Sequence, residues 1–306
     1  MSQITNTILM IKPVAFKMNE QTAINNHFQK KSKKTDADIQ DKALKEFNIL
    51  VKKLEKEGVK VIVIEDTKKP KTPDSIFPNN WISFHEKNIV CVYPMFAENR
   101  RDERREDILE VVETQGYKID NIIDYTSAEN QDVFLEGTGS MVLDRVNKIA
   151  YCALSPRSNE ELFIEFCEDM EYTPITFRAN QQVNSKRKAI YHTNVMMSIG
   201  EKFALICLQT ITDKKQRKQV SSMLLNSGKE IINISEEQVN NFTGNILQVK
   251  GKDDKLLIIM STTAYNSLSK AQISIIEKHG KIIKSNVKTI EDNGGGSVRC
   301  MLTEIF

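Results

Sequence analysis

The stretch Asn293-Gly-Gly-Gly-Ser-Val-Arg-Cys-Met-Leu-Thr-Glu-Ile-Phe306 places a glycine loop, one cysteine and an apolar segment in direct succession. Three consecutive glycines allow backbone conformations that a side chain would forbid, so the chain can approach a ligand closely there. We expect Cys300 at the start of a buried strand, at a sheet edge that faces a cleft. The same stretch also fits a final strand with a buried structural cysteine. The spacing of other polar residues favours a nucleophile.

Polar residues that could perform chemistry recur at a regular interval before this cysteine. His192 lies 108 residues before Cys300, Glu136 lies 56 residues before His192, and Asn80 lies 56 residues before Glu136. A further position is expected near residue 246, where 243–248 reads Thr-Gly-Asn-Ile-Leu-Gln. A period of roughly 55 residues indicates a repeat architecture.

Each repeat predicts the same order of elements, namely a hairpin, a helix and a third strand. Two short apolar runs broken by Gly, Asn, Asp or Lys are typical of a hairpin, and apolar residues at helical spacing follow each one. The hairpins are expected at 81–84 with 89–93, 140–143 with 149–154, 195–199 with 203–209, and 246–249 with 256–261. The helices are expected at 104–115, 159–170, 214–227 and 270–279, and the third strands at 121–125, 173–177, 229–234 and 280–287.

The two ends of the chain supply the fifth repeat. Strands at 7–13 and 58–66 flank a long helix at 38–57, and the first of them should complete its unit with 300–306. Five units whose ends share one sheet describe a closed ring, which leaves no exposed sheet edges. We therefore predict an α/β protein, a five-bladed pseudo-symmetric α/β propeller, that forms a single domain over residues 1–306 with one central active site.

Composition limits the partners and the compartment. The 306 residues are 40% hydrophobic and 27% charged with a net charge of +2, so no electrostatic case exists for nucleic acid or a membrane surface. No apolar run reaches transmembrane length, and no signal peptide is recognised. Five cysteines without a CxxC pair predict free thiols and a cytoplasmic protein. The charge run at 29–38 is expected to be a solvated loop.

A cysteine nucleophile needs a partner that handles protons, and histidine is the usual one. We expect His192 to begin a strand in register with Cys300, and Glu136 to hydrogen-bond its imidazole and favour the protonated form. A satisfied core histidine is the alternative for His192. The other three histidines are expected to be structural or exposed, three further cysteines are expected to be small core residues in the second strands of hairpins, and no cluster has the spacing of metal ligands. These are His27, His85, His279, Cys91, Cys152 and Cys207.

Five motifs in order resemble the pentein superfamily of guanidine-modifying enzymes, and the resemblance covers essentially the whole chain. The superfamily includes arginine deiminases, dimethylarginine hydrolases and amidinotransferases, and the closest similarity is to citrulline-utilisation hydrolases. The resemblance implies the pentein propeller fold and a cysteine-dependent hydrolase that needs no cofactor. The motifs are Asp74-Ser-Ile-Phe-Pro-Asn-Asn80, Leu135-Glu-Gly-Thr-Gly139, Ser155-Pro-Arg-Ser-Asn159, His192-Thr-Asn194 and Gly294-Gly-Gly-Ser-Val-Arg-Cys300.

The resemblance also implies residue roles. Cys300 would be the nucleophile, His192 the general acid and base, and Glu136 its carboxylate partner. Arg157 would bind the substrate α-carboxylate through a fork-like pair, and a basic side chain from Asn99-Arg-Arg101, Arg101, would assist. The remaining substrate contacts would come from Asp74, Phe77, Asn79, Asn80 and Asn194.

Asn80 and Asn194 depart from the deiminase pattern, which has aspartates at both positions. Carboxylates accept from a cationic guanidinium, whereas an asparagine amide can also donate to the carbonyl of a neutral ureido group. The sequence therefore favours a free amino acid, citrulline, cleaved to ornithine, carbon dioxide and ammonia. Arginine deiminase, dimethylarginine hydrolase and amidinotransferase activities remain alternatives, as does a binding protein that has lost catalysis. The sequence leaves a homo-oligomer open.

Overall fold

The computed structural model describes residues 2–306, and within them lie five three-stranded sheets and one separate hairpin. In each three-stranded sheet the first pairing is antiparallel and the second is parallel. This is the predicted order of hairpin, crossover and third strand. The sheet orders are β17-β1-β2, β3-β4-β5, β6-β7-β8, β11-β12-β13 and β14-β15-β16, with β9-β10 as the hairpin.

The strands are short, as expected for units of this size. Their bounds are β1 Thr7–Lys12, β2 Lys60–Glu65, β3 Ile82–His85, β4 Ile89–Val92, β5 Asn121–Asp124, β6 Met141–Asp144, β7 Ile149–Ala153, β8 Thr173–Phe177, β9 Asn180–Val183, β10 Lys186–Ala189, β11 Met197–Ile199, β12 Phe203–Ile206, β13 Glu230–Asn233, β14 Leu247–Lys250, β15 Leu256–Ser261, β16 Lys281–Ser285 and β17 Thr303–Ile305.

The helices fall into long crossover helices and short turns. Their bounds are α1 Glu20–Ala23, α2 Asp36–Lys56, α3 Glu98–Arg101, α4 Asp107–Thr114, α5 Gly137–Ser140, α6 Glu160–Asp169, α7 Thr193–Met196, α8 Lys214–Asn226, α9 Glu236–Asn240, α10 Thr262–Ser267, α11 Lys270–His279 and α12 Lys288–Gly294. The 3₁₀ turns are η1 Pro78–Asn80, η2 Thr126–Gln131, η3 Leu208–Thr210, η4 Lys252–Asp254 and η5 Val298–Met301.

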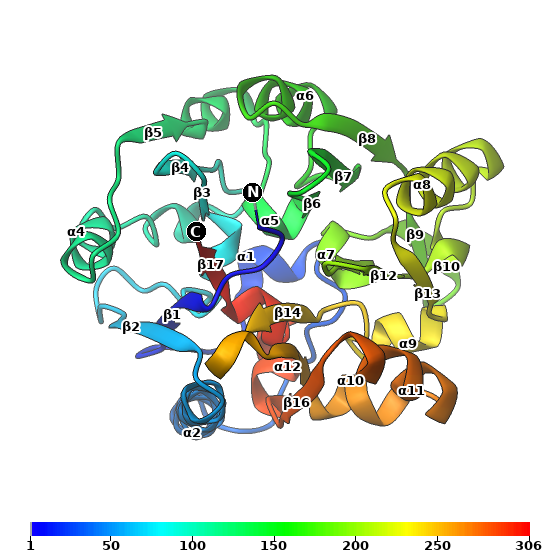
Figure 1. Cartoon of the computed structure of the whole chain (residues 1–306). Helices are drawn as coiled ribbons and strands as arrows, with labels where there is room; N and C mark the ends of the chain where they lie inside the picture. The colour runs from blue at the N-terminus through cyan, green and yellow to red at the C-terminus, as the bar shows by residue number, and fades with distance from the viewer. Residues whose placement is uncertain (1) are drawn as a thin grey trace.

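The crossover helices lie on the outside of the molecule. Two parallel strands cannot be joined by a tight turn, so a longer connection must carry the chain back, and here α2, α4, α6, α8 and α11 do so. Figure 1 shows these helices around the rim, whereas β3, β6, β14 and β17 lie near the middle of the molecule. The inner strands of neighbouring units contact one another. Strand β17 contacts β3, and β11 contacts both β6 and β14. The first strand of each unit therefore faces the centre.

Helix α2 illustrates why these segments become helical. The Thr35 side chain accepts a hydrogen bond from the Asp38 amide at 3.1 Å, which caps the first turn. Apolar residues then recur every three or four positions on one buried face, where a fully buried side chain contributes roughly 1.5–3 kcal/mol. These residues are Ile39, Ala43, Phe47, Leu50 and Leu54.

The expectation that both ends of the chain share a sheet is confirmed. Strand β17 pairs antiparallel with β1, with Thr7 opposite Ile305, and β1 pairs parallel with β2. The predicted extent of the last strand is wrong, however, because only Thr303–Ile305 are extended. Residues Val298–Met301, including Cys300, form the turn η5 instead.

The β9–β10 hairpin was not expected from the sequence. Strand β10 reads Lys-Arg-Lys-Ala and is largely exposed, so it lacks the apolar alternation that marks a strand. Its register, with Lys186 opposite Val183, is set by a tight turn in which Asn184 has a φ of 53°. Among residues 2–306, no helix is both long and apolar enough to cross a membrane.

Candidate active site

A small buried cavity lies where the inner ends of several units meet, and it has a volume of about 10 Å³. That is about the space of a single water molecule, so in this structure the cavity is nearly closed. The lining residues come from six separate segments of the chain, and most of them are polar. They are Thr22, Asn26, Asp74, Phe77, Asn80, Arg100, Arg157, Tyr191, His192, Gly294, Gly296 and Cys300.

Polar residues of the repeat occupy equivalent positions just before the inner strands. Glu136 precedes the turn α5 and strand β6, and His192 precedes the turn α7 and strand β11. The prediction that His192 begins a strand is therefore wrong. The Thr193 hydroxyl holds this turn by accepting from the Ala153 amide at 2.7 Å and donating to the Ser140 carbonyl. These side-chain bonds replace the ladder bonds that a strand would make.

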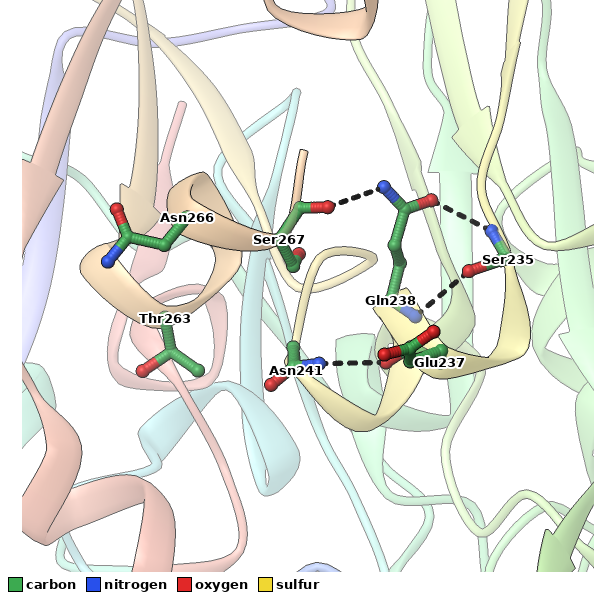
Figure 2. A pocket seen from close by; sticks show the side chains of 7 residues that line it. All are labelled: Ser235, Glu237, Gln238, Asn241, Thr263, Asn266 and Ser267. Atoms are coloured by element: carbon green, nitrogen blue, oxygen red, sulfur yellow. Dashed lines mark hydrogen bonds between the residues drawn. The ribbon is translucent and has the colours of Figure 1, made fainter. Parts of the chain in front are cut away.

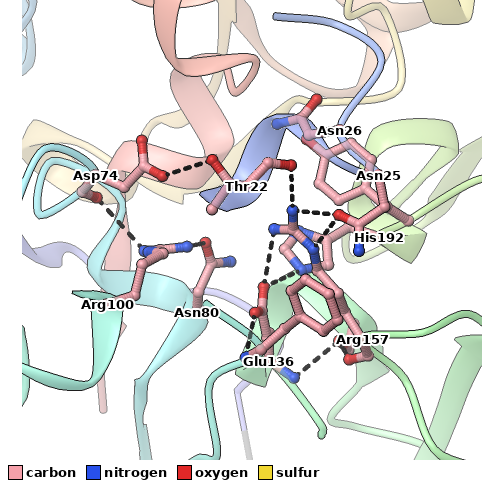
Figure 3. A network of polar contacts seen from close by, with 12 residues as sticks. Thr22, Asn25, Asn26, Asp74, Asn80, Arg100, Glu136, Arg157 and His192 are labelled. Carbon is pink, nitrogen blue, oxygen red and sulfur yellow. Dashed lines mark hydrogen bonds and ion pairs between the residues drawn. The ribbon is translucent and has the colours of Figure 1, made fainter. Parts of the chain in front are cut away.

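His192 and Glu136 form a buried hydrogen-bonded pair. The His192 Nε2 atom lies 2.7 Å from Glu136 Oε2, and both side chains are almost wholly buried. The same Oε2 lies 3.3 Å from Arg157 Nη1, and the Phe96 amide donates to Glu136 Oε1 at 3.0 Å. Figure 3 shows the Glu136 carboxylate beside the guanidinium of Arg157.

Burial and neighbouring charges have opposing effects on the pKa of each member of this pair. Burial disfavours ionised Glu136, but Arg157, His192 and Arg100 outweigh it and hold its pKa below the usual range. Burial lowers the pKa of His192 to about 4, and the positive charges of Arg157 and Arg100 outweigh part of the support from Glu136. Glu136 does favour the protonated form of His192, as expected, but burial outweighs this effect and leaves the imidazole neutral at pH 7.

The Cys300 sulfur lies among amide side chains. Asn245 Nδ2 is 3.2 Å from Sγ, and Asn194 Nδ2 is 3.7 Å from it. Burial raises the pKa of the Cys300 thiol, while the hydrogen bond from Asn245 lowers it. All five cysteines are free and buried. The resting pair is thus a thiol and a neutral imidazole, both in the wall of one cavity.

The first motif supplies three of the predicted site residues to the cavity wall and leaves one outside it. Asp74, Phe77 and Asn80 line the cavity, whereas Asn79 is buried behind it and donates to Thr138 Oγ1 at 3.3 Å. Asp74 Oδ2 accepts from Asn19 Nδ2 at 2.8 Å and from the Thr22 hydroxyl at 3.0 Å. Its Oδ1 is buried and has no hydrogen-bond partner within residues 2–306.

Arg157 lies in the cavity wall, and protein atoms occupy the edge of its guanidinium. Its Nε donates to Asn25 Oδ1 at 2.8 Å, and Nη2 donates to Asn25 Oδ1 and to the Thr22 carbonyl. This is the edge that a carboxylate would take as a fork-like pair. Figure 3 shows Thr22 and Asn25 above the guanidinium and Glu136 below it.

The structure places Arg100, not Arg101, in the cavity wall. Arg101 Nε donates to the Met95 carbonyl at 3.2 Å and lies 3.4 Å from Glu129, away from the cavity lining. Arg100 is buried, donates to Asn80 Oδ1 at 2.8 Å, and pairs with Glu103 at 2.8 Å. Neighbouring residues on a helix point about 100° apart, so a one-residue error selects a different environment.

Sequence reasoning missed the N-terminal segment and two further residues of the site. Thr22 and Asn26 cover the cavity, Tyr191 donates to the Gly295 carbonyl at 2.7 Å, and Asn245 contacts the sulfur. The position of Asn245 was signalled by the repeat, because it falls in the expected interval 243–248. The run of polar residues at 19–26 was the available signal for the covering segment.

If pockets were compared by volume alone, a different part of the molecule would be chosen as the candidate site. A surface pocket of about 770 Å³ lies between α9 and α10 and is lined by seven polar residues (Figure 2). Its lining contains no cysteine or histidine, and several of its groups bond to one another, as Gln238 does with Ser235 and Ser267. No group of three or more His, Cys, Asp or Glu side chains in the described chain could hold a metal ion.

Several solved structures share the fold of this chain. ArgZ, an arginine dihydrolase from the ornithine–ammonia cycle in cyanobacteria, superposes with a TM-score of 0.74 at 17% identity. The match covers 98% of this chain but 40% of full-length ArgZ, so the chain spans less than half of that protein. The substrate-bound N-terminal domain of ArgZ matches over 97% of its length with a TM-score of 0.71. A dimethylarginine dimethylaminohydrolase bound to S-methyl-L-thiocitrulline matches with a TM-score of 0.62 at 14% identity over its whole length.

The fold is that of the pentein superfamily, which includes arginine dihydrolases and dimethylarginine hydrolases. The family itself is given by the sequence. Residues 12–306 match the family described as N,N dimethylarginine dimethylhydrolase, eukaryotic, and the chain belongs to it. A search of curated proteins found no significant match.

Proposed function

We propose that the chain is a single-domain, five-bladed α/β propeller that hydrolyses the ureido or guanidino C–N bond of a free amino acid, with citrulline as the preferred substrate. The observation that carries this proposal is the convergence of Cys300 and His192 on one cavity, with Glu136 bonded to the imidazole at 2.7 Å. Membership of a family of C–N hydrolases supports it.

The proposed roles follow from the protonation of the resting pair. His192 takes the proton of the Cys300 thiol as the sulfur attacks the ureido carbon, and the carbon–Nδ bond then breaks. The proton passes from His192 to the leaving nitrogen, which departs as ornithine, and an S-carbamoyl group remains on Cys300. His192 next removes a proton from water, whose attack releases carbamate and restores the thiol. Glu136 holds the imidazole in the tautomer that this transfer requires.

The neutral amide of Asn80 in the cavity wall favours a neutral ureido group. Asn80 Oδ1 accepts from Arg100, and one hydrogen of its Nδ2 is bonded to Asn79 Oδ1 at 3.2 Å. The second Nδ2 hydrogen is left to donate to a carbonyl oxygen. Asp74 Oδ1 is a buried acceptor without a donor, and an N–H of the substrate would satisfy it.

A second candidate is hydrolysis of arginine or a methylated arginine. The unpaired oxygen of Asp74 is equally suited to a guanidinium N–H, and the family description names dimethylarginine. With these substrates ammonia or a methylated amine would leave first, and citrulline would be the product. Transfer to an amine instead of water is tested by adding glycine as an acceptor.

Substrate preference is tested by measuring kcat/KM for citrulline, arginine and asymmetric dimethylarginine side by side, with product analysis. We expect citrulline to be preferred and Cys300→Ser to abolish turnover. Asn80→Asp should lower the ratio of kcat/KM for citrulline to that for arginine by about 10-fold. The substitution replaces the amide donor with a carboxylate, which only accepts and carries a negative charge. Asn80→Ala separates the two effects, since it removes the donor without adding charge.

The outcomes separate the parts of the proposal. A wild-type preference for arginine or dimethylarginine would overturn the citrulline assignment while keeping the hydrolase. Turnover by the Cys300→Ser variant would overturn the nucleophile. No turnover of any of the three substrates by the wild-type protein would favour a binding protein.

A further inference from the structure

Asn245 is the nearest polar contact of the Cys300 sulfur in this structure. It lies between α9 and β14, just before an inner strand, which is the repeat position that Glu136 and His192 occupy in other units. Its side chain is 1% exposed, and its Nδ2 atom is 3.2 Å from Sγ, compared with 3.7 Å for Asn194 Nδ2.

The orientation of the Asn245 amide is fixed by its other bonds. Oδ1 accepts from the backbone amide of Arg299 at 3.0 Å, and Nδ2 also donates to the backbone carbonyl of Asn194 at 3.0 Å. A flipped amide would place its NH₂ group against the Arg299 N–H and its oxygen against the Asn194 carbonyl. Both contacts would be repulsive, so the donor side faces the sulfur.

We propose that Asn245 is a positioning residue that holds the Cys300 sulfur and stabilises its thiolate through an N–H···S hydrogen bond. The inference rests on the proposed role of Cys300 as the nucleophile. A buried thiolate is disfavoured unless donors compensate for the lost water, and a hydrogen bond to a charged group is stronger than one between neutral groups. The neighbouring backbone contact matters as well, because Arg299 directly precedes Cys300 and is bound to the same amide.

The contact also links three units of the chain at one point. Asn245 donates to Asn194 of the turn after His192 and accepts from Arg299 of the turn that carries Cys300. The side chain thus sets the distance between the turn that holds the acid and base and the turn that holds the sulfur. Its loss should impair the chemical step more than substrate binding, because Asn245 is not among the residues that line the cavity.

The test compares Asn245→Ala and Asn245→Asp with the wild type. The readout is the rate of alkylation of Cys300 by iodoacetamide as a function of pH, followed on the Cys300 peptide by mass spectrometry. We expect the thiol pKa to rise by about one to two units, which slows alkylation about 10- to 100-fold below the wild-type pKa. With substrate, kcat should fall by a similar factor while KM changes less than about twofold.

Thr243→Val is the matched control on the same loop. The Thr243 hydroxyl bonds to Ser267 and does not touch the sulfur, so this variant loses a loop hydrogen bond without altering the thiol. Near-ultraviolet circular dichroism checks that each variant is folded. Asn245→Asp preserves the acceptor for the Arg299 amide and nearly the same volume, so it decides the question if Asn245→Ala does not fold.

A folded Asn245 variant with the alkylation profile of the wild type would overturn the inference and leave Asn245 with a packing role. The same shift in Thr243→Val would also overturn it, because the effect would then come from the loop. Failure of the proposed function is distinguishable from both results. If Cys300→Ser retains turnover, the nucleophile assignment fails, whereas the alkylation profile still reports whether Asn245 bonds to the sulfur.

Discussion

Gly139 lies where the imidazole of His192 and the amide of Asn80 leave no room for a side chain. A Cβ atom there would come within 2.4 Å of Asn80 Nδ2 and 2.8 Å of His192 Nδ1. Gly139→Ala must therefore displace one or both groups. A displacement of about 1 Å at a reacting group can cost about 100-fold in rate. We expect kcat/KM to fall by about that factor, with a loss of roughly 1–3 kcal/mol in the free energy of unfolding.

Gly228→Ala is the control for the loss of a glycine. This position has a φ of +76° and no atom within 4 Å of the added methyl group. The substitution should cost roughly 1–2 kcal/mol of stability through backbone strain and leave kcat/KM unchanged. Equal kinetics for wild type and Gly139→Ala would show that neither His192 nor Asn80 has to stay in place.

At the scale of elements, the N-terminal segment around α1 acts as a cover over the cavity. Thr22 and Asn26 line the cavity from this segment, and Asn25 binds the outer edge of Arg157. Asn26 Nδ2 also reaches the carbonyls of Gly294 and Gly295 at 3.3 Å. A cavity of about 10 Å³ cannot hold an amino acid, so the proposed function predicts that this cover moves when the substrate enters.

Asn25→Ala should loosen the cover. It removes the acceptor for Nε and Nη2 of Arg157, and hydrogen bonds to a charged group contribute roughly 1.5–3 kcal/mol. We expect amide hydrogen exchange in residues 19–29 to become at least about 10-fold faster. Lys17→Ala, which removes an exposed ion pair with Asp36, is the control and should change little. Unchanged exchange in Asn25→Ala would mean that the apolar contacts of Phe28 hold the cover closed instead.

At the scale of the whole molecule, buried neutral histidines make the free energy of unfolding depend on pH. Burial lowers the pKa of His192 to about 4, and burial with Arg145 and Lys148 lowers that of His85 well below its usual value. The unfolded chain binds these protons near pH 6.5, so it takes up more protons than the folded chain below that pH. The stability is fully present above pH 6.5 and falls as the pH drops toward 4, by up to roughly 1.4 kcal/mol per pH unit for each histidine.

Replacing His85 tests this dependence without touching the cavity. His85 Nδ1 lies 3.3 Å from Arg145 Nη1, and Nε2 lies 2.7 Å from the Ser83 hydroxyl, so the ring accepts from arginine and must be neutral. Urea unfolding of His85→Gln between pH 7 and 4.5 should show a shallower loss of stability than the wild type. Parallel curves for the two proteins would contradict the assignment.

The overall plan could be predicted from the sequence because it depends on local signals. Each unit can be recognised from two apolar runs around a turn and from a helix with one apolar face. The predicted bounds of the long helix α2 differ from the observed ones by two residues at the N-terminus and one at the C-terminus. The turns that carry His192 and Cys300 could not be predicted. They are held by contacts between residues far apart, such as Thr193 with Ala153 and Arg299 with Asn245.

The site was predictable in part for the same reason. The repeat spacing marked Glu136, His192, Cys300 and the interval containing Asn245, because equivalent positions in a repeat converge in space. The choice between Arg100 and Arg101 depends on the phase of a four-residue helix, which no local pattern fixes. The low pKa of His192 could not be inferred either, since it results from burial and from two arginines brought close by the fold.

The pairing of β1 with β17 bears on how the protein is made. Thr5 and Ile305, which bond to each other at 2.6 Å, are 300 residues apart in the chain. At about 5–20 residues per second, a ribosome needs roughly 15 to 60 seconds to deliver the partner strand after β1 has emerged. Throughout that interval the segment Thr-Ile-Leu-Met-Ile-Lys of β1 lacks its antiparallel neighbour and presents an apolar, unpaired edge. The yield of folded protein in cells should therefore fall when chaperones that bind nascent chains are depleted, even though the stability of the folded state is unchanged.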